Sequence, residues 1–194
     1  MTDSYTTINN IGEGFYAEKR SKFLAFAYHV ETAENAKNLI QECRKKYYDA
    51  RHCCWAYVLG PARDIFRVND DGEPSSTAGR PILGQINSNN LTDILICVVR
   101  YYGGVNLGTS GLIVAYRTAA ANAIEHCEIV ERLVEDKITF DFSYPMINGV
   151  MRVVKEMDAR IISQKFEATC QIVLAIRKSL AEQLRTKLNH LNFE

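Results

Sequence analysis

Long apolar runs alternate with amphipathic segments along this chain, and one neighbouring pair is predicted to organise the rest. Residues 94–102 are almost entirely apolar, with Arg100 as the interruption, which is typical of a strand covered on both faces at the centre of a sheet. Two glycines and a polar loop follow. Residues 112–126 then form an alanine-rich amphipathic run without proline, which predicts a helix.

The N-terminal part of the chain has β-forming residues followed by one helical pattern. Residues 5–8 and 14–30 are predicted strands, and we interpret the charged cluster at residues 18–22 as a solvated strand end. Thr32 is a predicted N-cap, after which apolar residues recur at three- and four-residue steps as far as Tyr47. This spacing predicts one helix with an apolar stripe.

The next segments are predicted to add two strands and a second helix. The strands fall at residues 51–59 and 64–68, with a Gly-Pro turn between them. A polar loop then leads into a helix with Pro81 near its start, where the missing N–H matters least. Residues 127–136 form a charged connection with room for a short strand.

From residue 137 the pattern reads strand, helix, strand, strand, helix. This is the ferredoxin-like order without its last strand, because residues 191–194 are too few to supply one. The predicted segments are residues 137–143, 144–157, 159–166, 168–177 and 179–190.

Composition narrows the class of protein. With 194 residues, 47% of them hydrophobic, the chain can bury a core and can form one large domain or two small ones. Basic and acidic residues balance at 23 each, so a nucleic-acid surface would have to be a local patch. The sequence has neither a transmembrane-length apolar stretch nor a signal-peptide layout, which predicts a cytoplasmic protein without membrane contact.

The six cysteines are predicted to be reduced core thiols, because they occupy apolar or amphipathic contexts in a chain with no export signal. His52 adjoins Cys53 and Cys54, but neighbouring residues on a strand point to opposite faces and no zinc-ligand spacing is present. We therefore expect no metal site. We interpret His52 as a hydrogen-bonded structural residue.

The loop after the predicted central strand has the composition of an anion site. Glycine allows close backbone approach, and the first N–H groups and the dipole of a helix favour negative charge. The pattern GGxNxGTSG matches neither the P-loop nor the Rossmann fingerprint, and capping of the helix by Thr109 or Ser110 explains the same residues. The predicted phosphate-binding residues are Arg80, Arg100, Gly103, Gly104, Asn106, Gly108, Thr109, Ser110, Gly111 and Arg117.

A second loop gathers three carboxylates, Asp70, Asp71 and Glu73, just before the predicted second helix. Hard oxygen ligands of this kind can hold Mg²⁺ together with a substrate phosphate. A turn in which Asp hydrogen-bonds to nearby backbone explains the same residues without a ligand. The sequence leaves both interpretations open.

Two motifs resemble the YigZ/IMPACT family: DDGEPSSTAGRP at residues 70–81 and VVRYYGGVNLGTSGLIVAYR at residues 98–117. Shorter matches at residues 21–23 and 50–57 keep the order and spacing of the family. Ser76 stands where the family usually has glycine, which alters this loop if the glycine serves close approach of a ligand.

The resemblance implies an α+β protein with two domains. Residues 1–135 would form an α/β domain of the type shared by a small-subunit ribosomal protein, domain IV of elongation factor G and the GHMP kinases. Residues 136–194 would form a ferredoxin-like domain akin to domain V of that elongation factor. Eukaryotic members carry an extra N-terminal module and regulate translation by interfering with activation of a kinase of initiation factor 2. For bacterial members, the resemblance implies contact with nucleic acid or the ribosome.

Three functions are compatible with these patterns. The first is a non-enzymatic RNA- or ribosome-binding protein linked to translation or its regulation, in which the arginines and the glycine loop bind phosphate groups. The second is a Mg²⁺-dependent enzyme acting on a phosphorylated small molecule or nucleotide, with Asp70, Asp71 and Glu73 on the metal. The third is a protein-interaction adaptor, with a protein partner in translation control. We favour the first, without a cofactor.

Overall fold

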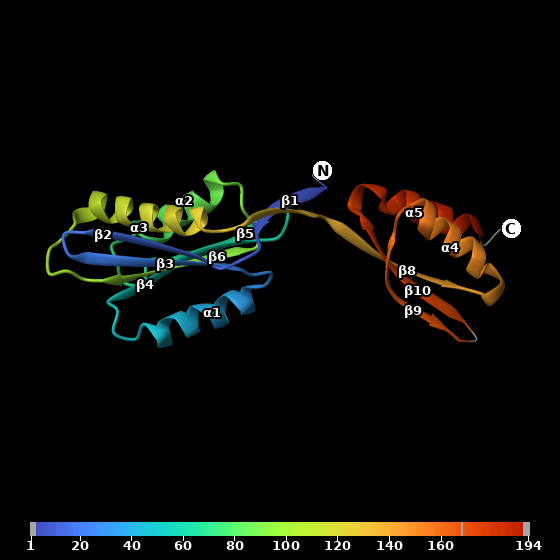
Figure 1. Ribbon diagram of the computed structural model, residues 1–194, viewed down its shortest axis with the longest axis horizontal. Coiled ribbons are helices and arrows are strands. Elements are labelled where there is room, and N and C mark those ends of the chain that lie inside the picture. Colours follow the sequence, from blue (N-terminus) through green and yellow to red (C-terminus); the bar gives the residue numbers. More distant parts are fainter. Residues whose placement is uncertain (1–2, 168, 192–194) are drawn as a thin grey trace. The chain divides into compact units, whose positions relative to one another are not determined.

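The computed structural model describes residues 3–167 and 169–191, and its contacts divide the chain into two compact units (Figure 1). The larger unit comprises residues 5–132 and is built on a five-stranded antiparallel sheet with the strand order β2-β3-β6-β4-β5. These strands are β2 (Gly12–Glu18), β3 (Ser21–His29), β4 (His52–Leu59), β5 (Ile65–Asn69) and β6 (Ile94–Tyr101).

Strand β6 lies at the centre of this sheet, as its apolar run predicts. Residues 94–99 have no exposed surface, because helices cover both faces. Helices α2 (Gly79–Ser88) and α3 (Gly108–Glu125) lie on one face, and α1 (Ala33–Lys46) lies on the other (Figure 1). Each face therefore has its own apolar cluster, and β6 contributes alternate residues to both.

The prediction of one strand over residues 14–30 is wrong. The chain reverses at Lys19 and Arg20, whose φ angles are 45° and 65°, and β2 and β3 pair as an antiparallel hairpin on either side of that turn. Left-handed backbone at two successive residues is what a tight hairpin turn requires. The charged cluster thus comprises this turn and the strand ends beside it, and within it Ser21 is fully buried.

The starts of the helices agree with the sequence in one case and differ in another. Thr32 caps α1, since its side-chain oxygen accepts a hydrogen bond from the Asn35 backbone N–H at 3.1 Å. Helix α3 begins at Gly108, four residues before the predicted start, and no side chain caps it. The alternative in which Thr109 or Ser110 caps this helix is therefore excluded, because both lie inside its first turn.

The smaller unit has the predicted order of strand, helix, strand, strand, helix. Its antiparallel sheet has the order β8-β10-β9, and helices α4 and α5 contribute to one core with it (Figure 1). The short strands β1 (Ser4–Ile8) and β7 (Ile129–Leu133) pair separately. The elements of the smaller unit are β8 (Glu135–Phe142), α4 (Ile147–Glu156), β9 (Arg160–Phe166), β10 (Cys170–Arg177) and α5 (Ala181–His190), with 3₁₀ turns at Tyr144–Met146 and Lys178–Leu180.

The sequence predicts that residues 191–194 are too few to form a last strand of the smaller unit. Residues 192–194 lie outside the described residues, so this stays a prediction. Among the helices within residues 3–167 and 169–191, none is both long enough and apolar enough to cross a membrane.

We predict that Gly14→Ala destabilises the larger unit. A Cβ at Gly14 would lie 2.4 Å from the Ala123 backbone nitrogen and 2.5 Å from the Ala119 carbonyl oxygen, so β2 and α3 would have to separate. We expect the free energy of unfolding in urea to fall by about 1–3 kcal/mol. Gly84→Ala is the matched control: its Cβ meets nothing within 4 Å inside α2, and we expect a gain of about 0.5–1 kcal/mol. Equal effects of the two substitutions would contradict this account of the packing.

Candidate phosphate-binding site

A cavity of about 520 Å³ lies where the end of β6, the start of β4 and the start of α3 meet. Sheet register brings the first two together, because His52 on β4 lies opposite Arg100 on β6. The glycine-rich loop after β6 then returns the chain to the same place as α3 begins. The cavity is lined by Arg51, His52, Glu73, Pro74, Arg100, Tyr102, Asn106, Leu107, Gly108, Thr109 and Leu112.

A buried ion pair forms the floor of this cavity. The Arg100 Nη1 donates to Glu73 Oε1 at 2.6 Å, and the two side chains are only 6% and 3% exposed. Either charge alone would be costly at this depth, so each depends on the other. The pair also fixes the acidic loop that precedes α2 against the end of the central strand.

Tyr116 of α3 joins the same network. Its hydroxyl donates to Glu73 Oε1 at 2.7 Å and accepts from the Cys54 thiol at 3.3 Å. Burial, followed by the neighbouring Cys54 and Glu73, raises the pKa of Tyr116 far above its ordinary value. Burial likewise raises the pKa of Cys54. Tyr116 therefore stays protonated and acts as a permanent donor to the carboxylate.

His52 is held in one orientation by the acidic loop. Its Nδ1 lies 2.7 Å from the Asp71 carbonyl oxygen, and because a carbonyl only accepts, Nδ1 carries the proton. Nε2 lies 3.8 Å from Glu73 Oε2, at the wall of the cavity. The interpretation of His52 as a hydrogen-bonded residue is confirmed, and the structure also gives it a face toward the cavity.

Arg100 has donor capacity left over. Its Nη2 reaches Ser21 Oγ at 3.4 Å, whereas its Nε is buried without a hydrogen-bond partner among the described residues. The guanidinium carbon lies 5.5 Å from the ring centres of Phe23 and Tyr102. This N–H group is therefore an unsatisfied buried donor, a rare feature in folded proteins.

The start of α3 supplies further donors. Gly108 and Thr109 line the cavity, and no side chain caps the first turn of this helix. Gly108 has a φ of 73°, a left-handed conformation that glycine adopts without strain. The helix therefore presents free N–H groups and the positive end of its dipole at the cavity wall. Exposed Arg51, which has no ion-pair partner among the residues described, adds a full positive charge.

The acidic loop does not gather its carboxylates around one point. Asp70 accepts from the backbone N–H groups of Ser76, Ala78 and Gly79 at 2.8–3.1 Å, and so caps the start of α2. Asp71 accepts from the Cys53 N–H at 2.7 Å and pairs with Arg44.

Glu73 belongs to the Arg100 network, so the three carboxylates have three separate sets of partners. This arrangement favours the turn interpretation of the loop over a shared Mg²⁺ site. Ser76, at the usual glycine position, has a φ of 65°.

The predicted phosphate-binding residues fall into three groups. Arg100, Asn106, Gly108 and Thr109 line the cavity. Gly103 and Gly104 shape the loop, and a Cβ at Gly103 would lie 2.2 Å from the Arg20 carbonyl carbon. The remaining predicted residues do not line it: Ser110 and Gly111 face a smaller neighbouring pocket, and Arg80 and Arg117 are exposed on α2 and α3.

Sequence reasoning missed several residues of the site. Arg51 and Leu107 line the cavity, Tyr116 anchors Glu73, and Ser21 accepts both from Arg100 and, at 3.2 Å, from the Gly103 N–H. The basic character of Arg51 beside His52 was a usable signal. No local pattern marks Tyr116 or Ser21, because their roles depend on contacts across the sheet.

Away from this cavity, three thiols form a group that could hold a metal ion. The sulfur atoms of Cys43, Cys53 and Cys97 lie within 4.8 Å of one another, on α1, β4 and β6. All six cysteines are free thiols, and these three are buried in the core under α1. Hydrogen bonds from the Cys53 and Cys97 thiols lower the pKa of Cys43. The expected absence of a metal stays a prediction.

Comparison with known proteins identifies the family. The sequence pattern of the Impact N-terminal domain matches residues 19–124, which include every residue that lines the cavity. The chain belongs to the IMPACT family. The family motifs at residues 70–81 and 98–117 thus form the two loops that meet at the cavity, and the predicted resemblance is confirmed.

Similarity to other IMPACT proteins extends beyond that domain. An IMPACT family member from Haemophilus influenzae is 33% identical over 172 residues, covering 88% of this chain and 84% of the relative. The family member YigZ of Escherichia coli is 31% identical over 172 residues, with the same two coverages of 88% and 84%. A crystal structure described as a hypothetical protein superposes with a TM-score of 0.75 at 29% identity, covering 97% of this chain and 92% of that one.

We predict that Glu73→Ala lowers the free energy of unfolding by about 3–5 kcal/mol, because it leaves Arg100 charged and buried without its partner. Urea denaturation measures the change. Glu31→Ala is the matched control in the same unit: Glu31 lies 3.2 Å from His29 Nε2 and forms an ion pair with Arg132, but its side chain is 64% exposed, so we expect a change below about 1 kcal/mol. A small effect at Glu73 would show that the buried pair does not hold the site together.

Proposed function

We propose that this IMPACT family protein is a non-enzymatic module that binds RNA or the ribosome and acts in translation or its regulation. The observation that supports this best is the convergence of two positive groups on one cavity. These are the uncapped start of α3 and the side chain of Arg51. Both are suited to a phosphate group.

The charge balance of the cavity supports an anion as the ligand. Glu73 neutralises Arg100, which leaves Arg51 and the helix dipole as the net electrostatic contribution. The chain as a whole has a formal net charge of +0, so the positive potential is local. A local patch is enough to position a phosphate backbone, whereas sequence readout would require contacts with base edges.

The proposal includes a domain assignment that follows from the family resemblance. We propose that residues 1–135 form the domain type of the ribosomal protein and elongation factor G domain IV, and that residues 136–194 form a ferredoxin-like domain. The strand order β8-β10-β9 supports the second assignment, since a ferredoxin-like sheet without its last strand has its first and second strands on either side of its third. A cytoplasmic location belongs to the same proposal.

A second candidate is an enzyme that acts on a phosphorylated small molecule or nucleotide. The observation that favours it is the orientation of His52, whose protonated Nδ1 is fixed by the Asp71 carbonyl and whose Nε2 lines the cavity. A histidine held in this way can serve as a general base. The separate partners of Asp70, Asp71 and Glu73 weigh against a Mg²⁺-dependent version.

We predict that Arg51→Ala weakens co-sedimentation of the protein with purified ribosomes by about tenfold at 50 mM salt, because one charged hydrogen bond to phosphate is lost. The dependence of binding on salt should also become less steep, by about one contact. Arg80→Ala removes the same charge from an exposed position outside the cavity and is the matched control. An equal loss in both variants would contradict the assignment of phosphate binding to the cavity.

Thr109→Glu provides a further test that separates binding from folding. A carboxylate in the first turn of α3 stabilises the helix by about 0.3–1 kcal/mol while repelling a phosphate from the same N–H groups. We therefore expect a protein at least as stable as the wild type that no longer sediments with ribosomes. Undiminished binding by this variant would contradict the proposal.

The enzyme candidate makes the opposite prediction for His52. If the protein is a binding module, the wild type should release no phosphate from nucleotides with Mg²⁺ present, and His52→Gln should change nothing in that assay. Phosphate release by the wild type that disappears in His52→Gln would favour the enzyme. Failure of both the ribosome and the nucleotide assays would favour a protein-interaction adaptor.

A further inference from the structure

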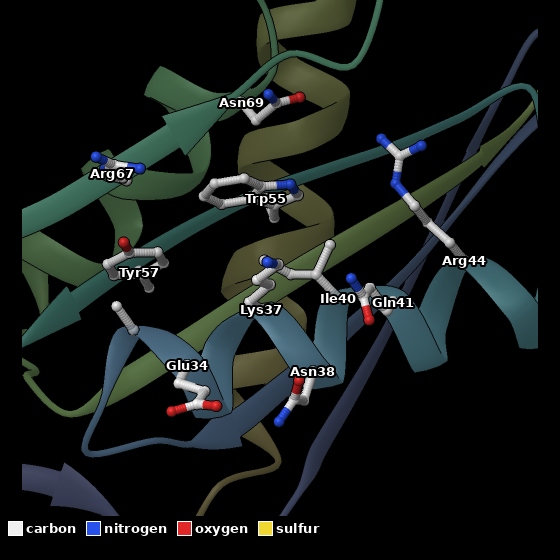
Figure 2. Close-up of a pocket in the computed structure, with 11 residues that line it drawn as sticks. Glu34, Lys37, Asn38, Ile40, Gln41, Arg44, Trp55, Tyr57, Arg67 and Asn69 are labelled. Carbon is white, nitrogen blue, oxygen red and sulfur yellow. The ribbon is translucent and has the colours of Figure 1, made fainter.

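A second hollow lies on the opposite face of the same sheet, and the proposed function does not use it. It is a groove of about 660 Å³ between α1 and the strands β4 and β5 (Figure 2). Strand β5 is at the edge of the sheet, so one side of the groove opens to solvent. The volume falls within the range of about 300–1,000 Å³ that is usual for ligand sites.

Two stacked aromatic rings lie on the strand side of the groove. Trp55 and Tyr57 are two residues apart on β4 and point to the same face, with ring centres 5.7 Å apart and planes only 2° from parallel. The partners across the ladder are Asn69 opposite Trp55 and Arg67 opposite Tyr57. The half-buried Trp55 occupies the middle of the groove in Figure 2.

Helix α1 supplies the facing wall. Lys37, Gln41 and Arg44 line the groove at spacings of three and four residues, so they share one face of this helix. Arg44 pairs with Asp71, whereas Lys37 and Arg67 form no ion pair among the residues that the structure describes. Glu34 is the acidic residue of the lining, so cations outnumber anions in the groove although the whole chain is neutral.

We infer that this groove binds a segment of single-stranded RNA, with a base stacked beside Trp55 and phosphates on Lys37 and Arg67. A planar aromatic surface flanked by cations is the combination that accepts any base without reading its identity. Gln41 and Asn69 also line the groove, and although Asn69 Oδ1 accepts from the Asp71 N–H at 2.7 Å, both side-chain NH₂ groups can donate to a base edge. The inference rests on the proposed RNA-binding function and adds a second contact on the other face of the sheet.

The fluorescence of Trp55 reports on this groove alone, because the chain contains one tryptophan. We expect an octamer of uridylate to quench the emission of the 194-residue chain in a saturable manner. With two phosphate contacts, the affinity should fall about sevenfold between 50 and 200 mM salt. The double variant Lys37→Ala, Arg67→Ala should bind more weakly and lose most of this salt dependence.

Stacking is tested by the anisotropy of a labelled octamer, which does not depend on tryptophan emission. Trp55→Leu should bind about tenfold more weakly, and Trp55→Phe, which keeps an aromatic face, should lose less. Equal binding by the leucine and phenylalanine variants and the wild type would overturn the inference. Quenching by uridine monophosphate or by polyglutamate as strong as that by the octamer would also overturn it, in favour of a mononucleotide or of an acidic peptide.

Failure of this inference can be told apart from failure of the proposed function. Ribosome binding that depends on Arg51, together with no quenching of Trp55 by the octamer, would overturn the groove and leave the cavity in place. Quenching that persists in Arg51→Ala, with no ribosome binding by any form of the protein, would support the groove and contradict the proposed role of the cavity.

Discussion

The buried ion pair between Arg100 and Glu73 is the interaction on which the arrangement of the site depends. It joins the end of the central strand to the loop before α2, and the Tyr116 hydroxyl extends it to α3. Three elements that are distant in sequence are thereby held around one cavity. Because both charges are removed from solvent, neither can be lost without leaving the other uncompensated.

This constraint also determines which groups are left for a ligand. The aspartates of the acidic loop already have partners within the protein. Asp70 accepts hydrogen bonds from the start of α2, and Asp71 pairs with Arg44 and accepts from the backbone of β4. The start of α3 has no such internal cap, and Arg51 has no ion-pair partner among the described residues. The two loops that carry the family motifs therefore differ: the first satisfies its own groups, and the second presents free donors.

How much could be predicted from the sequence differs by element. The central strand and α1 follow from local pattern, since an apolar run and a Thr32 cap have one simple interpretation. The reversal at Lys19 and Arg20 was missed because neither residue is a usual turn former, and the left-handed backbone there is set by the pairing of β2 with β3. Arg100 and Glu73 could each be singled out, but their pairing depends on tertiary contacts. The groove around Trp55 likewise depends on the register of β4 with β5.

The most direct test of the central claim, that the start of α3 and Arg51 bind RNA phosphate, is an NMR titration of isotope-labelled protein with a ribosomal RNA fragment. We predict that the amide signals of residues 108–111 and the Nε–H signal of Arg51 shift in a saturable way, and that the shifts weaken as salt is raised. The claim would be contradicted if these signals stayed unchanged while other signals shifted on addition of RNA, or if no signal shifted at all.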